Sequence, residues 1–161
     1  MNFFKILFSV KPTDDEIVIN LSRVLLFDNL SLRDLEELSL EIEVKRLDKD
    51  AVIFSENDES DGMYIIQQGG VNILKKDKTG NEIVIATLGN FDYFGEMSLI
   101  DNIKRTATVK TIVPSVAYFL SKSNFHLMLK KNKFTTIKIL FNLSRTLSRR
   151  LELTTKNFVL R

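Results

Sequence analysis

The chain has 161 residues, of which 44% are hydrophobic and 27% are charged. This is enough for one domain with a hydrophobic core and argues against bulk disorder. The absence of cysteine excludes disulfides, thiolate metal sites and cysteine nucleophiles, and a single histidine, His126, excludes a multi-histidine metal centre. No apolar run approaches the roughly 20 residues that a membrane-spanning helix needs.

The net charge of +2 hides an asymmetry along the chain. Residues 1–120 carry 13 basic and 20 acidic side chains, a net charge of −7, whereas residues 121–161 carry 10 basic and one acidic, a net charge of +9. The sequence therefore combines an acidic body with a basic C-terminal segment.

The N-terminal region begins with ten strongly apolar residues, MNFFKILFSV, which lack the length and cleavage site of a signal peptide. They are expected to pack on the domain or a partner, or to form a weak membrane-surface anchor. Helices are predicted within 13–41. Thr13 and Ser31 are predicted helix caps, each followed three residues later by an acidic side chain.

The central region is predicted to form short strands, because segments rich in Val, Ile, Tyr and Phe alternate with turn signals. These segments are 43–46, 51–54, 63–67, 71–75, 82–88, 106–112 and 116–120. Short strands at this spacing favour a sandwich, jelly roll or barrel, and the lack of intervening long helices disfavours a Rossmann-type sheet.

The C-terminal region is predicted to be helical, with Ser121 or Ser123 capping a first helix and a longer helix running from about 134 towards 158. Apolar positions of the longer helix repeat at intervals of three and four residues, a heptad seam. The seam consists of Ile137, Leu140, Ser144, Leu147 and Leu151. It would pack either on the same chain or on a second copy.

The segment 91–109, FDYFGEMSLIDNIKRTATV, carries the clearest chemical signal. Gly95 permits a tight turn, and a helical turn over 96–99 would point free N–H groups at an anion. Arg105 could bind a phosphate through two parallel hydrogen bonds, and Glu96 could accept hydrogen bonds from hydroxyls. Together they describe a ribose-phosphate site. The alternative is an ordinary salt bridge between Glu96 and Arg105.

The run FGEMSLIDNIKRTATV resembles the phosphate-binding cassette of the cyclic nucleotide-binding domain family, F-G-E-(Leu/Met)-(Ala/Ser)-L followed by P-R-(Ala/Ser/Thr)-A-T-V. The resemblance extends over about residues 20–155, including an I-x-x-G-x-V turn carried by Ile66, Gly69 and Val71. It implies an α+β, mainly β fold: an antiparallel β-jelly-roll, the cyclic nucleotide-binding β-roll. N-terminal helices (1–42) and C-terminal lid or dimerisation helices (121–161) would flank this β-roll (43–120).

The resemblance also implies roles for individual residues. Glu96 would accept a hydrogen bond from the ribose 2′-hydroxyl, and Arg105 would pair with the cyclic phosphate. The backbone around the cassette would complete the anion site. In this family, threonine at the position of Thr106 is associated with binding of cGMP, and it does not exclude cAMP. The implied ligand-binding residues are Gly95, Glu96, Met97, Ser98, Arg105, Thr106 and Ala107. No metal is implied.

Four positions depart from the family pattern. Lys104 replaces the proline before the arginine, which loosens the loop and adds a cation near the phosphate. Asp50, Asn57 and Phe91 stand where turn glycines are usual. Asp and Asn tolerate a left-handed conformation, but a bulky phenylalanine does not, so the turn at Phe91 is expected to have changed shape.

Other candidate sites carry weaker signals. His126 is expected to be a packed or surface residue. The basic side chains Arg145, Arg149, Arg150 and Lys156 are expected to form a solvated helix face or to contact an acidic surface. Specific DNA binding is not expected, because the regulators of this family need a helix-turn-helix domain after the long helix. An enzyme is not expected either, because the pocket lacks a metal-binding cluster.

The sequence thus predicts a cytoplasmic, stand-alone sensory domain that binds cAMP, cGMP or both and relays the ligand state through its C-terminal helix. Its partners would be the nucleotide and an unidentified effector protein, together with a second copy if the helix dimerises. Two alternatives remain: a ligand-free β-roll acting as a structural or protein-interaction module, and weak nucleic-acid or lipid binding by the basic helices.

Overall fold

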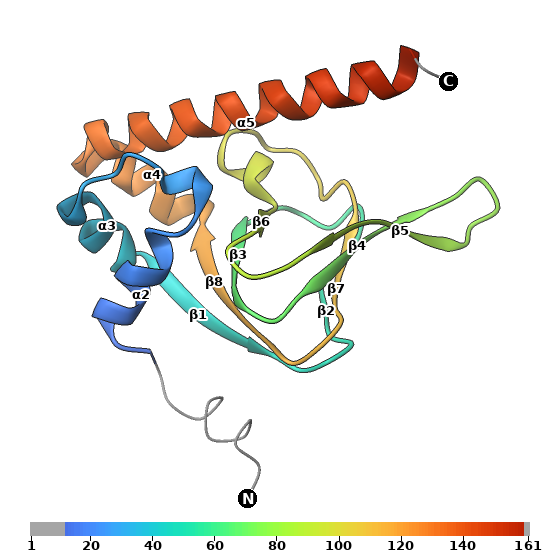
Figure 1. Cartoon of the computed structure of the whole chain (residues 1–161), viewed down its shortest axis with the longest axis horizontal. Helices are drawn as coiled ribbons and strands as arrows, with labels where there is room; N and C mark the ends of the chain where they lie inside the picture. Colours follow the sequence, from blue (N-terminus) through green and yellow to red (C-terminus); the bar gives the residue numbers. More distant parts are fainter. Residues whose placement is uncertain (1–11, 160–161) are drawn as a thin grey trace, which may run out of the picture.

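The computed structural model describes residues 12–159 and places helices at both ends of two antiparallel sheets (Figure 1). The apolar N-terminal ten residues lie outside the described residues. The predicted architecture, an antiparallel β-roll flanked by helices, is confirmed. None of the helices in 12–159 combines the length and hydropathy needed to cross a membrane.

The N-terminal helices begin where the caps were predicted. Helix α2 (Asp14–Leu21) starts after Thr13 and helix α3 (Leu32–Ser39) after Ser31, and both starts are complete capping boxes. The short helix η1 (Leu25–Phe27) joins them. The apolar faces of these helices, which include the fully buried Leu21 and Leu38, pack in one core cluster with residues of the first sheet.

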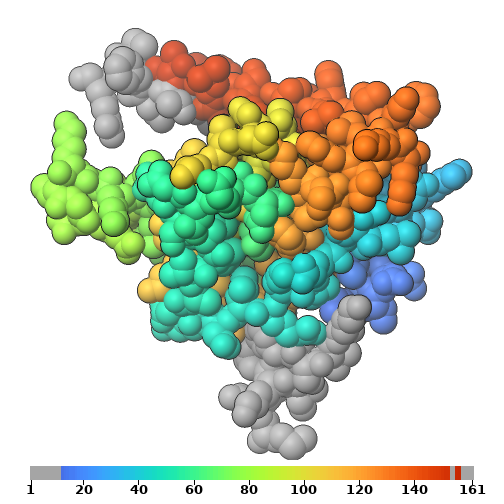
Figure 2. All heavy atoms as spheres, turned by 180° about the vertical axis from the view of Figure 1, so that it is seen from behind, coloured from blue at the N-terminus to red at the C-terminus, as the bar shows by residue number. Residues whose placement is uncertain are grey.

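The two sheets each contain four strands, in the orders β1-β8-β3-β6 and β2-β7-β4-β5. All pairs are antiparallel. The strands are β1 (Ile42–Leu47), β2 (Val52–Phe54), β3 (Gly62–Gln68), β4 (Val71–Lys76), β5 (Glu82–Leu88), β6 (Tyr93–Phe94), β7 (Thr108–Thr111) and β8 (Ser115–Ser121). The β4–β5 hairpin projects from the body in both views (Figures 1 and 2).

The core has two parts. One lies between the helices and the sheet of β1, β8 and β3, and Leu26, Tyr118 and Phe125 are almost completely buried within it. The other lies inside the roll, where Tyr64 stacks on Phe94 with ring centroids 5.3 Å apart. This aromatic cluster forms the inner wall of the roll on the side where the candidate site lies.

The turn at Phe91 differs from the expectation. Asp50, Asn57 and Phe91 all adopt positive φ, at 63°, 72° and 67°. The prediction that the Phe91 turn had changed shape is therefore wrong. The Phe91 ring packs against the first core and lies under the guanidinium of Arg23, 5.3 Å from the ring centroid. These contacts offset the strain of a bulky left-handed residue.

The C-terminal helices are α4 (Lys122–Lys131), capped by Ser121, and α5 (Lys133–Val159). The predicted seam of α5 is split: Leu140 and Leu147 pack against the core, whereas Ile137 and Leu151 are exposed. The fully buried positions are instead Ile139 and Leu143. Part of the seam therefore packs on the same chain.

A buried carboxylate fastens α5 to α3. Asp34 accepts hydrogen bonds from Lys138 at 2.7 Å, from the Ser31 backbone at 2.8 Å and from the Thr135 hydroxyl. Burial by itself raises the pKa of Asp34, but these bonds outweigh it and hold the pKa well below its usual range.

We expect this anchor to weaken in acid. Because the folded-state pKa is depressed, its contribution to stability is present above the unfolded pKa of about 4 and is lost as the pH falls below that value. Asp34→Asn should lower the free energy of unfolding at neutral pH by about 1–3 kcal/mol and flatten its acid dependence. Urea titrations at several pH values check this, with the exposed Asp15→Asn as the control; an unchanged acid slope in Asp34→Asn would contradict the assignment.

Candidate functional site

A pocket of about 370 Å³ opens between the roll, the helix η2 (Glu96–Leu99) and α5. One side is apolar and the other carries the charged residues. Its apolar side includes Phe54, Ile73, Ala86, Leu88, Tyr93, Phe94 and Val109; its polar side includes Ser60, Glu96, Ser98, Lys104, Arg105, Thr106 and Arg150. The volume falls within the range of about 300–1,000 Å³ typical of small-molecule sites.

The turn before η2 positions its residues against the pocket. Gly95 has a φ of 74°, and a Cβ atom there would lie 2.5 Å from Nη1 of Arg105. The Ser98 hydroxyl donates to the Gly95 carbonyl at 2.7 Å and closes the turn. Glycine is therefore required at position 95 both for the left-handed backbone and for the close approach of the arginine.

Arg105 is a buried cation, with 5% of the residue exposed. Its Nη2 donates to the Asp61 carboxylate at 2.7 Å, and its guanidinium carbon lies 4.0 Å from the centroid of the Phe54 ring. Its Nε is buried and has no hydrogen-bond partner among the described residues. Asp61 is itself 70% exposed at the side chain, so the pair opens to solvent on one side. The guanidinium thus has one unused donor, Nε, and one donor, Nη2, whose exposed partner Asp61 an anion could replace.

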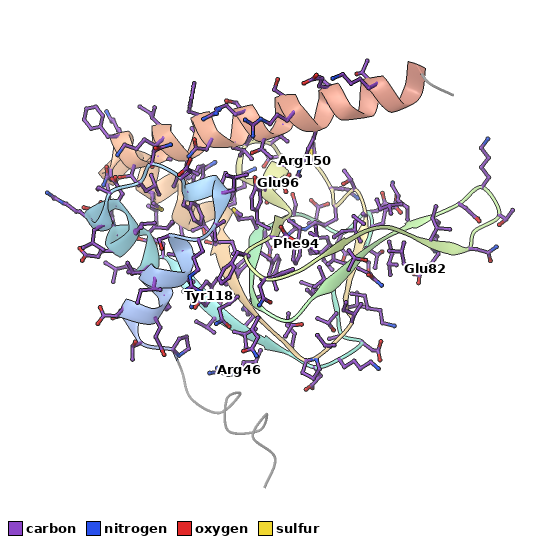
Figure 3. All side chains as sticks on the ribbon, in the orientation of Figure 1. Arg46, Glu82, Phe94, Glu96, Tyr118 and Arg150 are labelled. Atoms are coloured by element: carbon purple, nitrogen blue, oxygen red, sulfur yellow. The ribbon has the colours of Figure 1, made fainter. Side chains whose placement is uncertain are left out.

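Glu96 is a buried carboxylate, with 4% of the residue exposed. It accepts a hydrogen bond from Nη1 of Arg150, which comes from α5 and also lies over the Tyr93 ring, 5.7 Å from its centroid. Figure 3 labels both side chains, Arg150 on α5 and Glu96 on the turn beneath it. Arg150 of the long helix α5 therefore contacts Glu96, the carboxylate that is expected to bind the ribose hydroxyl.

The structure brings all seven predicted residues to the lining of this one pocket: Gly95, Glu96, Met97, Ser98, Arg105, Thr106 and Ala107. The alternative of a direct salt bridge between Glu96 and Arg105 is wrong, because Glu96 pairs with Arg150 and Arg105 pairs with Asp61. Strand β7 begins at Thr108, so Thr106 and Ala107 lie in the irregular segment before it.

Two charged residues of the site were not predicted to belong to it. Asp61 lies in an acidic turn that offers no distinguishing pattern, and Arg150 was assigned to a solvated face or an acidic contact. Lys104 also lines the pocket, but its amine lies 3.6 Å from the Glu59 carboxylate. His126 lies on α4, with Nε2 3.3 Å from the Leu99 carbonyl oxygen at the end of η2.

Within residues 12–159, no three His, Cys, Asp or Glu side chains gather closely enough to hold a metal ion. The charged groups of the pocket are a carboxylate and arginines beside an apolar wall. Such an arrangement suits an anion that also carries hydroxyls and a flat apolar part.

Comparison with known proteins assigns the family. The signature described as "Cyclic nucleotide-binding domain" matches residues 44–132. A cAMP-dependent protein kinase regulatory subunit from Mycosarcoma maydis is 33% identical over 84 residues, covering 52% of this chain and 16% of that protein. A CRP-like cAMP-activated global transcriptional regulator from Mycobacterium tuberculosis is 27% identical over 143 residues, covering 89% of this chain and 61% of that protein.

The fold has close counterparts as well. A cyclic nucleotide-binding domain from Methylobacillus flagellatus superposes with a TM-score of 0.78 at 24% identity, covering 91% of this chain and 82% of that one. The chain thus spans less than two thirds of either relative matched by sequence. Because the family signature covers more than half of its residues, the chain belongs to the cyclic nucleotide-binding domain family.

Proposed function

We propose that this chain binds cAMP, cGMP or both in the pocket beneath α5 and acts as a sensory module. The observation that carries the proposal is the placement of Arg105 and Glu96, both almost fully buried, on the polar side of one 370 Å³ pocket. The two relatives named above have cAMP in their names, which supports the same ligand class here.

Each part of a cyclic nucleotide has a matching group. The cyclic phosphate would bind the guanidinium of Arg105 in place of the Asp61 carboxylate. The ribose hydroxyl would donate to Glu96, and the base would lie against the apolar wall that includes Phe54, Ile73 and Leu88. Thr106 lines the pocket and is exposed, and its hydroxyl would favour cGMP.

The ion pairs of the site suggest how binding would be relayed. Asp61 bonds the Arg105 guanidinium that the phosphate would bind, and Arg150 bonds the Glu96 carboxylate that the ribose hydroxyl would bind. A nucleotide must therefore compete with both, and displacing Arg150 would release α5 from Glu96. A ligand shifts a conformational equilibrium only through such differential contacts. The released helix would then present a changed surface to an effector protein.

Calorimetric titration of the full chain with cAMP and with cGMP tests the proposal. We expect saturable binding. The heat-capacity change on binding should be negative, because the nucleotide buries apolar surface of the pocket. Thr106→Ala should weaken binding of cGMP and leave binding of cAMP unchanged. No heat at millimolar concentrations of either nucleotide would contradict the proposal and favour a ligand-free β-roll that serves as an interaction module.

A further inference from the structure

The outer face of α5 carries an apolar stripe, Phe134, Ile137 and Phe141. These residues are 82%, 56% and 63% exposed, and Phe134 is the most exposed large hydrophobic residue of the described chain. Intervals of three and four residues place them along one line of the helix. The opposite face holds Ile139 and Leu143, which are fully buried, so the stripe takes no part in docking α5 on the body.

Basic side chains accompany this stripe, on α5 itself and at the adjoining end of α4. The basic collar consists of Lys130, Lys131, Lys133, Arg145 and Arg149, all exposed. None of the five has an ion-pair partner in the part of the chain that the structure describes. The single acidic residue of the C-terminal segment, Glu152, is bonded to Lys156 at 2.6 Å. The exposed side of α5, together with the end of α4, therefore carries both apolar side chains and basic side chains without ion-pair partners among the described residues; Glu37 of α3 bonds Asn132 at the junction of the two helices.

The position of the helix leaves this surface accessible. Helix α5 runs along one side of the molecule, and no described segment lies over its outer face in either view (Figures 1 and 2). The stripe lies on the exposed side of this helix, and we call the stripe and the collar together the ridge. Such a ridge meets a flat surface more readily than it encloses a peptide.

The charges of this ridge distinguish between three possible binding partners: a second copy of the chain, nucleic acid and an anionic membrane. A symmetric contact between the α5 helices of two copies would bring two basic collars together, which is unfavourable. Nucleic acid would neutralise the collar but would leave an aliphatic residue such as Ile137 in water. An anionic membrane surface satisfies both features, because lipid phosphates attract the lysines while the headgroup layer accepts shallow apolar side chains.

We propose that the outer face of α5 docks this domain on an anionic lipid membrane. The stripe would enter the headgroup layer and the collar would contact the lipid phosphates, with α5 lying in the plane of the surface. The contact is peripheral, and no spanning segment is involved. It also leaves the nucleotide pocket free, since Arg150 and Glu96 lie on the inner side of the helix.

Sedimentation of the full chain with lipid vesicles tests the proposal. We expect binding to vesicles that contain phosphatidylserine, little binding to phosphatidylcholine alone, and a steep loss of binding with salt. The double variant Phe134→Ser/Phe141→Ser should weaken binding roughly tenfold or more. Reversal of charge at Lys130, Lys131 and Lys133 should weaken it by a similar factor of about ten or more.

Control variants test whether the loss of vesicle binding is specific to the stripe and the collar or follows from any change in surface hydrophobicity or charge. Leu40→Ser removes an equally exposed apolar side chain elsewhere, and Lys76→Glu/Lys78→Glu reverses charge on the β4–β5 hairpin. Both should bind vesicles as the unaltered chain does. The stripe variant Phe134→Ser/Phe141→Ser should bind cAMP and cGMP as the unaltered chain does, so that failure of nucleotide binding and failure of membrane binding are distinguishable.

Several outcomes would overturn the proposal. These are equal binding to both kinds of vesicle, binding that salt does not alter, and normal binding by the stripe variant. Self-association that the stripe variant abolishes, in the absence of vesicle binding, would assign the ridge to a second copy. A salt-sensitive complex with RNA but none with vesicles would assign it to nucleic acid.

Discussion

Replacing Arg105 with alanine is expected to reduce affinity for cAMP and cGMP by at least about a hundredfold, because charge-assisted hydrogen bonds to a phosphate contribute about 1.5–3 kcal/mol each. Arg105 lines the pocket, and alanine at this position offers no donor to the phosphate. Calorimetric titration of the variant against the unaltered chain measures the change.

The folding of this variant needs its own check, because Arg105 also bonds Asp61 and packs on Phe54. Arg105→Lys keeps the charge but lacks the paired donors, so it should retain the fold and still lose most of the affinity. The exposed Lys78→Ala, on the β4–β5 hairpin and outside the pocket lining, is the control and should leave affinity unchanged. Folded Arg105 variants with unchanged affinity would show that the phosphate is not bound there.

The second large effect is expected at Arg150, in the opposite direction. Arg150→Ala removes the group that occupies the Glu96 carboxylate, so a ribose hydroxyl no longer competes with it. We expect nucleotide affinity to rise about three- to tenfold, the equivalent of roughly 1 kcal/mol for one partly exposed ion pair. Without nucleotide, the same variant should be less stable by about 1–3 kcal/mol, because Glu96 is left buried without its partner.

A double-mutant cycle distinguishes this competition from a general loosening of α5. Glu96→Gln combined with Arg150→Ala should recover much of the stability lost in Arg150→Ala, since the buried charge is gone. Arg149→Ala removes an exposed neighbour and should change neither affinity nor stability. Weaker nucleotide binding in Arg150→Ala would mean that Arg150 contacts the ligand directly and does not compete with it.

Much of the fold was predictable because its signals are local. Thr13 and Ser31 cap helices through bonds to residues three positions away, so each capping box is visible in the sequence. Gly95 and the helical turn after it were predictable for the same reason. The strands of the roll followed from alternating apolar segments and turns, although the two-residue strand β6 was missed because it is too short to show a pattern.

The turn at Phe91 shows where a local rule fails. Its φ of 67° conflicts with the preference of a bulky residue, yet the structure retains it. The compensating contacts come from the core and from Arg23, which is 68 positions earlier in the chain. Intrinsic backbone preference is worth only about 1–3 kcal/mol, which side-chain packing of this kind can outweigh.

The sequence by itself determined the roll, the helix starts and the cluster of cassette residues around Glu96 and Arg105, because these depend on neighbours within a few positions. Only the tertiary structure decided their partners: Asp61 lies 44 positions from Arg105, and Arg150 lies 54 positions from Glu96. It also decided which face of α5 is buried, since apolar residues occur on more than one side of that helix. Long-range pairing depends on how the elements dock, and burial against a given surface is a property of the assembled domain.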